Sequence, residues 1–137
     1  MQLKRDTEFA MQIMVCIAER QKEDKKMTGV PTSEVITETR IPLVTFQRIC
    51  GYLEERQLIR KETTADGDSR LYPGKNFWGQ SLLSIAEAVE GNMQIFVIFN
   101  RNTSLVQKYG EVFKDAQKEV SKSLSNITLD MLVNQTV

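Results

Sequence analysis

The chain has 137 residues, 41% of them hydrophobic and 26% charged, and its formal net charge is zero. This composition is typical of an ordinary globular protein in one compact unit and excludes a disordered chain. Histidine is absent, which removes the commonest metal ligand and the commonest general base, so we expect neither an enzyme nor a metal site. Because positive and negative charges balance over the whole chain, any surface that binds a polyanion must be a local cluster of basic residues.

The sequence has no apolar run near the roughly 20 residues that cross a bilayer, and its charged start is unlike a secretory signal. We therefore expect a cytoplasmic protein with no membrane partner. Cys16 and Cys50 stand beside apolar neighbours in helical patterns rather than at metal-ligand spacing. This pattern favours buried, reduced thiols.

The first predicted helix is capped by Asp6 or Thr7 and ends near Arg20. Phe9, with later apolar residues at helical spacing, makes one buried stripe along it. A charged connector follows, and then a short strand is predicted from Met27 to Val30.

Two helices in tight succession come next. A short helix capped by Thr32 should end around Thr39, and a longer one is predicted from Ile41 to Leu58, with Pro42 in its first turn. Apolar residues of the longer helix recur at three-, four- and seven-residue spacings, which leaves its other face for solvent or a partner. The pair predicts a helix-turn-helix, and we expect the longer helix to enter a DNA major groove.

A predicted hairpin follows directly. Residues 58–64 alternate as a strand, residues 65–68 supply a turn, and residues 70–72 return. A hairpin after a helix-turn-helix indicates a winged helix. The hairpin ends at Pro73, and the next residues should place Phe77 or Trp78 in the core.

The last third of the chain is predicted to be helical. One helix starts at Ser81 and closes at Gly91, and a short one is capped by Thr128. Between them, residues 93–99 are an apolar run that is either a buried strand or an extended segment. A long helix over residues 104–124 would be roughly 30 Å long, more than a small winged helix can cover, so we predict a two-fold dimer. The apolar stripe of that dimer helix is Leu105, Tyr109, Val112, Phe113, Ala116, Val120 and Leu124.

The predicted fold class is therefore mainly α: a winged helix-turn-helix with a small β-hairpin wing and a long C-terminal dimerisation helix. Residues 1–80 should form the DNA-binding domain. Residues 81–137 should form an effector or connector region and the dimerisation helix, continuous with the first part in one compact unit.

Several segments in a fixed order carry a resemblance to a known family. They are LKRDTEFAMQIMVCIA at the start, the helix-turn-helix and wing, AVEG at residues 88–91, and SNITLDML near the end. In this order they resemble the Rrf2 family of bacterial winged-helix transcription regulators, over nearly the whole chain. The resemblance implies a homodimer, here expected to be a repressor, that presents two recognition helices to a pseudo-palindromic operator of double-stranded DNA, with half-sites about 34 Å apart. The alternative is a winged-helix protein-interaction module that has lost DNA binding, which the zero net charge favours.

In this family, residues just inside the recognition helix contact bases, which implies Val44, Thr45, Gln47 and Arg48 here. Arg48 can pair bidentately with guanine, and Gln47 with adenine. Phosphate contacts are expected from cations and hydroxyls near the groove: Lys4, Arg5, Thr32, Ser33, Arg60, Lys61 and Arg70.

Two departures from the family pattern narrow these expectations. Asp66 and Asp68 stand at the wing tip, where family wings are glycine-rich, and DNA phosphates would repel them. Many members hold an iron–sulfur cluster on three cysteines before the long helix, but residues 91–103 contain no cysteine. The chain therefore resembles the cluster-free members, and no cofactor is expected.

A regulator still needs a signal, and three sources stay open. One is a small molecule near the aromatic pair and the apolar run, with Phe77, Trp78, Ile95 and Val97 as the pocket residues. The others are a protein partner and oxidation of Cys50, whose place on an apolar face disfavours it.

Overall fold

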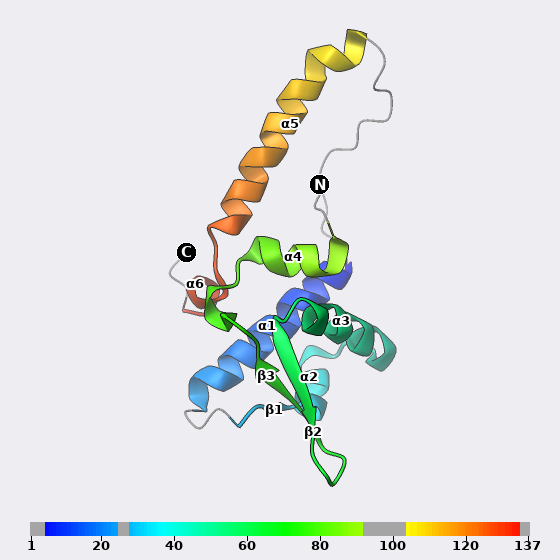
Figure 1. Ribbon diagram of the computed structural model, residues 1–137, viewed down its shortest axis with the longest axis vertical. Helices are drawn as coiled ribbons and strands as arrows, with labels where there is room; N and C mark the ends of the chain where they lie inside the picture. Colours follow the sequence, from blue (N-terminus) through cyan, green and yellow to red (C-terminus); the bar gives the residue numbers. More distant parts are fainter. Residues whose placement is uncertain (1–4, 25–27, 92–103, 135–137) are drawn as a thin grey trace.

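The computed structural model describes residues 5–24, 28–91 and 104–134. A small three-stranded sheet accompanies the helices, and in Figure 1 the last long helix projects away from the globule that the other elements form. The elements in chain order are α1 (Arg5–Glu23), β1 (Val30–Pro31), α2 (Thr32–Thr39), α3 (Leu43–Glu55), β2 (Ile59–Thr63), β3 (Ser69–Pro73), the 3-10 turn η1 (Phe77–Gly79), α4 (Leu82–Glu90), α5 (Ser104–Ser125) and α6 (Leu129–Val133). This arrangement confirms the predicted winged helix-turn-helix with a long C-terminal helix.

Helix α1 is the element on which the others pack, because it contacts α2, α3, α4 and α6. Ala10, Ile13 and Ile17 recur at helical spacing and are fully buried. The predicted end near Arg20 is wrong, because the helix continues to Glu23. Gln21 explains the difference: it is buried and extends the inward face by a turn, although its amide broke the apolar pattern in the sequence.

The turn between α2 and α3 sets where the longer helix begins. Arg40 adopts a left-handed conformation with φ of 58°, and Pro42 is extended with ψ of 139°. Helix α3 therefore starts at Leu43, and the prediction that it began at Ile41 with Pro42 in its first turn is wrong. The residue directly before a proline disfavours helical geometry, so Ile41 precedes the helix instead of starting it. The Ile41 side chain is buried in the core.

The far end of α3 and the start of α2 also differ from the prediction. Helix α3 ends at Glu55 rather than Leu58, because Gln57 takes a left-handed φ of 62° and turns the chain into β2. Thr32 is the first residue of α2 and not its cap, a place that Pro31 occupies. The Thr32 hydroxyl lies 2.9 Å from the Ser69 hydroxyl and so joins α2 to the wing.

The sheet has the order β1-β3-β2, and both pairings are antiparallel. The predicted hairpin is confirmed, with Ile59 opposite Pro73 at its base and Thr63 opposite Ser69 near its tip. The first strand holds only Val30 and Pro31, which pair with β3. The predicted strand over residues 27–30 therefore overlaps β1 at Val30 only. Met27 lies outside the described residues.

The C-terminal elements return to the globule beside the start of α4. Ser81 caps α4 by accepting a hydrogen bond from the Ser84 N–H at 3.1 Å, and Thr128 caps α6 in the same way. The two capping residues form an isolated antiparallel bridge, in which the Leu82 N–H donates to the Ile127 carbonyl at 2.9 Å. Thr128 is confirmed as a cap, and Ser81, predicted as the start of the helix, caps it one residue before its first residue, Leu82. Residues 93–99 lie outside the described residues.

Phe77 fulfils the prediction for the segment after the wing. Its side chain is buried, and Trp78 packs edge-on against it with ring centroids 5.5 Å apart. The hydrophobic core contains Phe77, and Trp78 packs against that core from a half-buried position. The 3-10 turn therefore joins the wing to the helical half through shared packing.

At the base of the hairpin, Gly74 lies close to the backbone of residues 57 and 58, and mutation can test this close approach. A Cβ on Gly74 would lie 2.2 Å from the Gln57 carbonyl oxygen and 2.6 Å from that of Leu58, so we expect Gly74→Ala to lower the free energy of unfolding by about 1–3 kcal/mol. Urea denaturation measures this. The matched variant Gly51→Ala, on the exposed side of α3 with nothing within 4 Å, should raise it by about 0.5–1 kcal/mol. Equal effects of the two substitutions would contradict the close approach at Gly74.

Candidate nucleic-acid interface

The N-terminal end of α3 presents the residues that the sequence proposed as base contacts. Phe46 and Ile49 hold the opposite face of the helix in the core, so the outward face is set by burial. Val44 is 77% exposed, and Gln47 is exposed as well, whereas Thr45 is half-buried. The four proposed residues therefore occupy one helix end, within the first two turns.

Leu43 is a candidate that the sequence did not suggest. It is 55% exposed beside Val44, on the first turn of α3. Sequence patterning assigns such a leucine to the core, and only the late helix start reveals that it faces outward. Exposed apolar side chains at this position have the chemistry to contact thymine methyl groups.

Arg48 is not free on this surface. Its Nη1 donates to Oδ2 of Asp6 at 2.5 Å and its Nη2 to Oδ1 at 3.4 Å, which makes a bidentate ion pair with the first turn of α1. The hydrogen bond to Asp6 and one to Tyr52 raise the pKa of Arg48 further above its ordinary value. The two side chains are 46% and 30% exposed, so the pair stays accessible to a ligand.

The described residues among the proposed phosphate contacts lie either at the starts of α1 and α2 or on the wing. Arg5 and Ser33 are exposed, at the first turns of α1 and α2, and Pro31 leaves α2 without a side-chain cap. Thr32 is half-buried and tied to the wing. Lys4 lies outside the described residues. The exposed Arg40, in the turn before α3, is a further cation at this surface that sequence reasoning missed.

The wing holds its cations in internal contacts. Arg70 donates from Nη1 to the carbonyls of Thr28 and Gly29, both at 3.2 Å, and its Nε lies 3.5 Å from a carboxylate oxygen of Asp68. It thus secures the loop before β1. Arg60 lies over the Tyr72 ring, 4.5 Å from its centroid, and pairs with Glu62. Lys61, between the two paired residues, is exposed.

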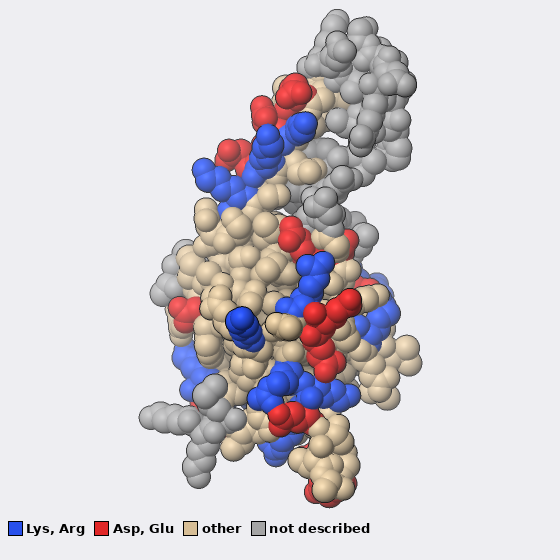
Figure 2. All heavy atoms as spheres, in the orientation of Figure 1, with Lys and Arg blue, Asp and Glu red and all other residues tan. Residues whose placement is uncertain are grey.

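The wing tip is an acidic turn. The Thr64 N–H donates to the Asp68 carbonyl at 2.7 Å, and the Thr64 hydroxyl donates to the Asp66 carboxylate. The hydrogen bond from the Thr64 hydroxyl, with backbone hydrogen bonds from Asp68 and Asp66, lowers the pKa of Asp66, which keeps it ionised. In Figure 2 acidic atoms mark the end of the wing, and basic side chains gather above it on the body of the protein. The tip therefore carries negative charge.

Helix α5 carries the predicted dimer stripe. Val112 is 64% exposed, and Tyr109 and Phe113 are exposed with their rings 5.4 Å apart. Ala116, Val120 and Leu124 are half-buried on the same side of the helix, whereas the Leu105 side chain lies outside the described residues. The outer half of α5 thus exposes large apolar side chains.

The proposed effector pocket is only partly described. Phe77 is packed in the core, so its ring serves the fold, and Trp78 is half-buried beside it. Ile95 and Val97 lie outside the described residues. In the described part of the chain, none of the helices combines the length and apolarity that crossing a membrane requires.

Both cysteines are free thiols in the core. Burial raises the pKa of Cys16 to about 12, with a contribution from its 3.4 Å hydrogen bond to Glu38. Burial likewise raises the pKa of Cys50 to about 12, and Glu54 adds to the effect. Neither thiol is set up to form a thiolate near neutral pH.

Comparison with known proteins gives one family. A family model described as "Rrf2: Iron-dependent Transcriptional regulator" matches residues 3–135. No curated protein sequence matches the chain.

Solved structures share the fold at low identity. IscR of T. potens has a TM-score of 0.72 at 18% identity and covers 98% of this chain and 88% of its own. CymR of B. subtilis, the global cysteine regulator, has a TM-score of 0.74 at 14% identity, covering 98% and 97%. The oxidised form of S. aureus CymR has a TM-score of 0.69 at 19% identity, covering 97% and 96%.

The residues present do not fit an iron site. Residues 92–103 contain no cysteine, histidine, aspartate or glutamate. Among the described residues, no three side chains of these types are grouped where they could hold a metal ion. The two thiols are buried on different helices with raised pKa values, and an iron–sulfur cluster requires thiolates. The donor set therefore disagrees with the iron dependence in the family description.

The raised thiol pKa values predict slow chemistry and a defined pH dependence. At a pH of about 8, Ellman's reagent should react with Cys16 and Cys50 only as fast as the protein unfolds. Below pH 9, the ordinary pKa of a thiol, the contribution of the two neutral thiols to the free energy of unfolding is fully present. That contribution is lost as the pH rises towards about 12, because unfolded thiols ionise first. Rapid labelling of the native protein would contradict this account.

Proposed function

The chain belongs to the Rrf2 family of transcriptional regulators, and we propose that it binds a specific DNA operator as a homodimer and represses transcription from it. The observation that carries the proposal is the outward face of α3, where Val44, Thr45, Gln47 and Arg48 stand together on a helix anchored in the core. Residues 1–80 would provide the DNA-binding part. Residues 81–137 would provide the connector and the dimer contact.

We propose direct readout by the first two turns of α3. Gln47 is exposed and has the donor and acceptor that match adenine, and Val44 has a methyl-bearing side chain suited to thymine. Arg5, Ser33 and Lys61 would contact phosphates and orient the helix in the groove. Arg70 would act indirectly, since its guanidinium secures the loop before β1.

The dimer proposal follows from α5. Large apolar side chains exposed along one side of a helix are stabilised when a second copy covers them. A two-fold pairing through this stripe would present two copies of α3 to one DNA duplex, as a pseudo-palindromic operator requires. In this proposal the protein acts by binding DNA and catalyses no reaction.

The alternative function is a winged-helix module that binds a protein instead of DNA. Two observations favour it: the acidic wing tip and the pairing of Arg48 with a carboxylate. The operator experiment below separates the two functions, because only the first requires preference among DNA sequences.

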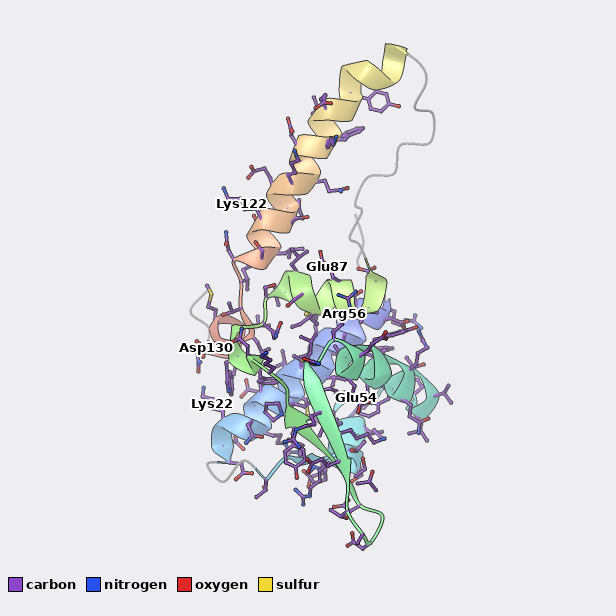
Figure 3. The ribbon with its side chains drawn as sticks, viewed as in Figure 1. Lys22, Glu54, Arg56, Glu87, Lys122 and Asp130 are labelled. Carbon is purple, nitrogen blue, oxygen red and sulfur yellow. The ribbon has the colours of Figure 1, made fainter. Side chains whose placement is uncertain are left out.

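The proposed function predicts that genomic selection with the purified protein enriches a pseudo-palindromic site, with affinity that falls steeply with salt. Arg48→Ala should lower the discrimination between that site and random DNA by about one to two orders of magnitude, measured by fluorescence anisotropy. The matched control is Arg56→Ala. Figure 3 shows Arg56 at the end of α3 nearer to α4, away from the reading end. If no fragment outcompetes random DNA, the operator proposal fails.

The dimer proposal predicts that Val112→Glu raises the dissociation constant of the dimer by about 100-fold, since the substitution buries an unpaired charge. Sedimentation equilibrium measures this. Lys114→Glu changes the charge of the same helix at an exposed site off the stripe, so the dimer should persist. A wild-type monomer at the concentrations used for DNA binding would overturn the proposal.

A further inference from the structure

The ion pair between α1 and α3 bears directly on how the reading helix is used. Arg48 is the only lysine or arginine in α3, whose other charged residues, Glu54 and Glu55, stand at its far end. Its partner Asp6 lies in the first turn of α1, 42 residues earlier in the chain. The one cation of the reading helix is therefore neutralised by a residue from another element.

The contact uses only part of the guanidinium. Nη1 and Nη2 each donate to a different oxygen of Asp6, so the carboxylate meets the end of the fork. Neither of these hydrogen bonds involves Nε, which together with the neighbouring terminal nitrogen forms a second edge with two parallel N–H groups. Guanine O6 and N7 are matched by such an edge. The two hydrogen bonds to Asp6 therefore do not themselves prevent Arg48 from reading a base.

The charge of Asp6 has a second effect. A carboxylate in the first turn of α1 is favourable to that helix, whose N-terminus carries partial positive charge. Near a DNA phosphate the same carboxylate is repulsive. Asp6 follows Arg5 directly, at the place where the chain is proposed to meet the backbone, and it cancels a charge that would otherwise attract any phosphate.

We propose that Asp6 is a specificity-determining positioning residue: it holds the Arg48 guanidinium in the geometry that reads guanine, and it lowers affinity for DNA of any sequence. This inference rests on the proposed operator binding. It assigns to an acidic residue the function of raising the ratio between specific and non-specific affinity. An ion pair that served only to join α1 to α3 would leave that ratio unchanged.

The test is Asp6→Asn, which keeps the shape of the side chain and removes its charge. Fluorescence anisotropy with the selected operator and with random DNA should show non-specific affinity raised about two- to fivefold, in line with the strength of exposed ion pairs. The dependence of log affinity on log salt should steepen by about one unit, because Arg48 becomes available to a phosphate. Preference for the guanine that Arg48 reads should fall.

Glu8→Gln is the matched control, since it removes the same charge from the same turn of α1 at an exposed site. It should change neither the salt dependence nor the guanine preference. In an Arg48→Ala background, Asp6→Asn should have no further effect on the guanine preference. Thermal unfolding of each variant separates these effects from loss of fold.

Three results would overturn the inference. One is an unchanged specificity ratio in Asp6→Asn, the second is an equal change in Glu8→Gln, and the third is the same change with Arg48 absent. Each leaves operator binding by the wild type intact. If the wild type itself shows no preference among DNA fragments, the proposed function fails together with the inference, and the wild-type measurement alone reveals that case.

Discussion

The packing of α3 against α1 is the contact on which the rest of the structure depends. Ile13 and Ile17 of α1 and Phe46 and Ile49 of α3 are all buried, and together they decide which side of α3 remains outside. Because side chains on a helix have fixed directions, burial of one face determines the residues on the other. The surface proposed to meet DNA is thus a consequence of how the core is packed.

The backbone between α2 and α3 adds a second constraint. A left-handed Arg40 and an extended Pro42 turn the chain sharply, and Ile41 anchors the turn in the core. This geometry places the first residue of α3 outside the core rather than inside it. A transcription regulator of this kind therefore depends on three residues that would contact few or no bases themselves.

Much of the fold was predictable from local patterns, and the reasons for success and failure differ by residue. Apolar spacing identified the helices, and cap residues such as Ser81 and Thr128 marked two helix starts, because both signals act over a few positions. The end of α1 was predicted too early because Gln21 is buried by tertiary packing, which the spacing of apolar residues does not show. The outward position of Leu43 depended on a turn geometry that composition does not reveal.

The candidate site was predicted in part for the same reason. The residues of the α3 face follow from helical periodicity and the family resemblance. The pairing of Arg48 with Asp6, and of Arg70 with the carbonyls before β1, joins residues 41 or 42 positions apart. Such contacts arise only when the elements pack, so a single sequence does not disclose which cations are already engaged.

The bridge between Ser81 and Thr128 has an implication for how such a chain diversifies. It joins two points of the globule that enclose α4, α5 and the segment between them, so this part of the chain is a closed excursion. Because the excursion begins and ends at this bridge, changes in sequence within α4 and α5 can accumulate while the helix-turn-helix, which lies outside it, stays as it is.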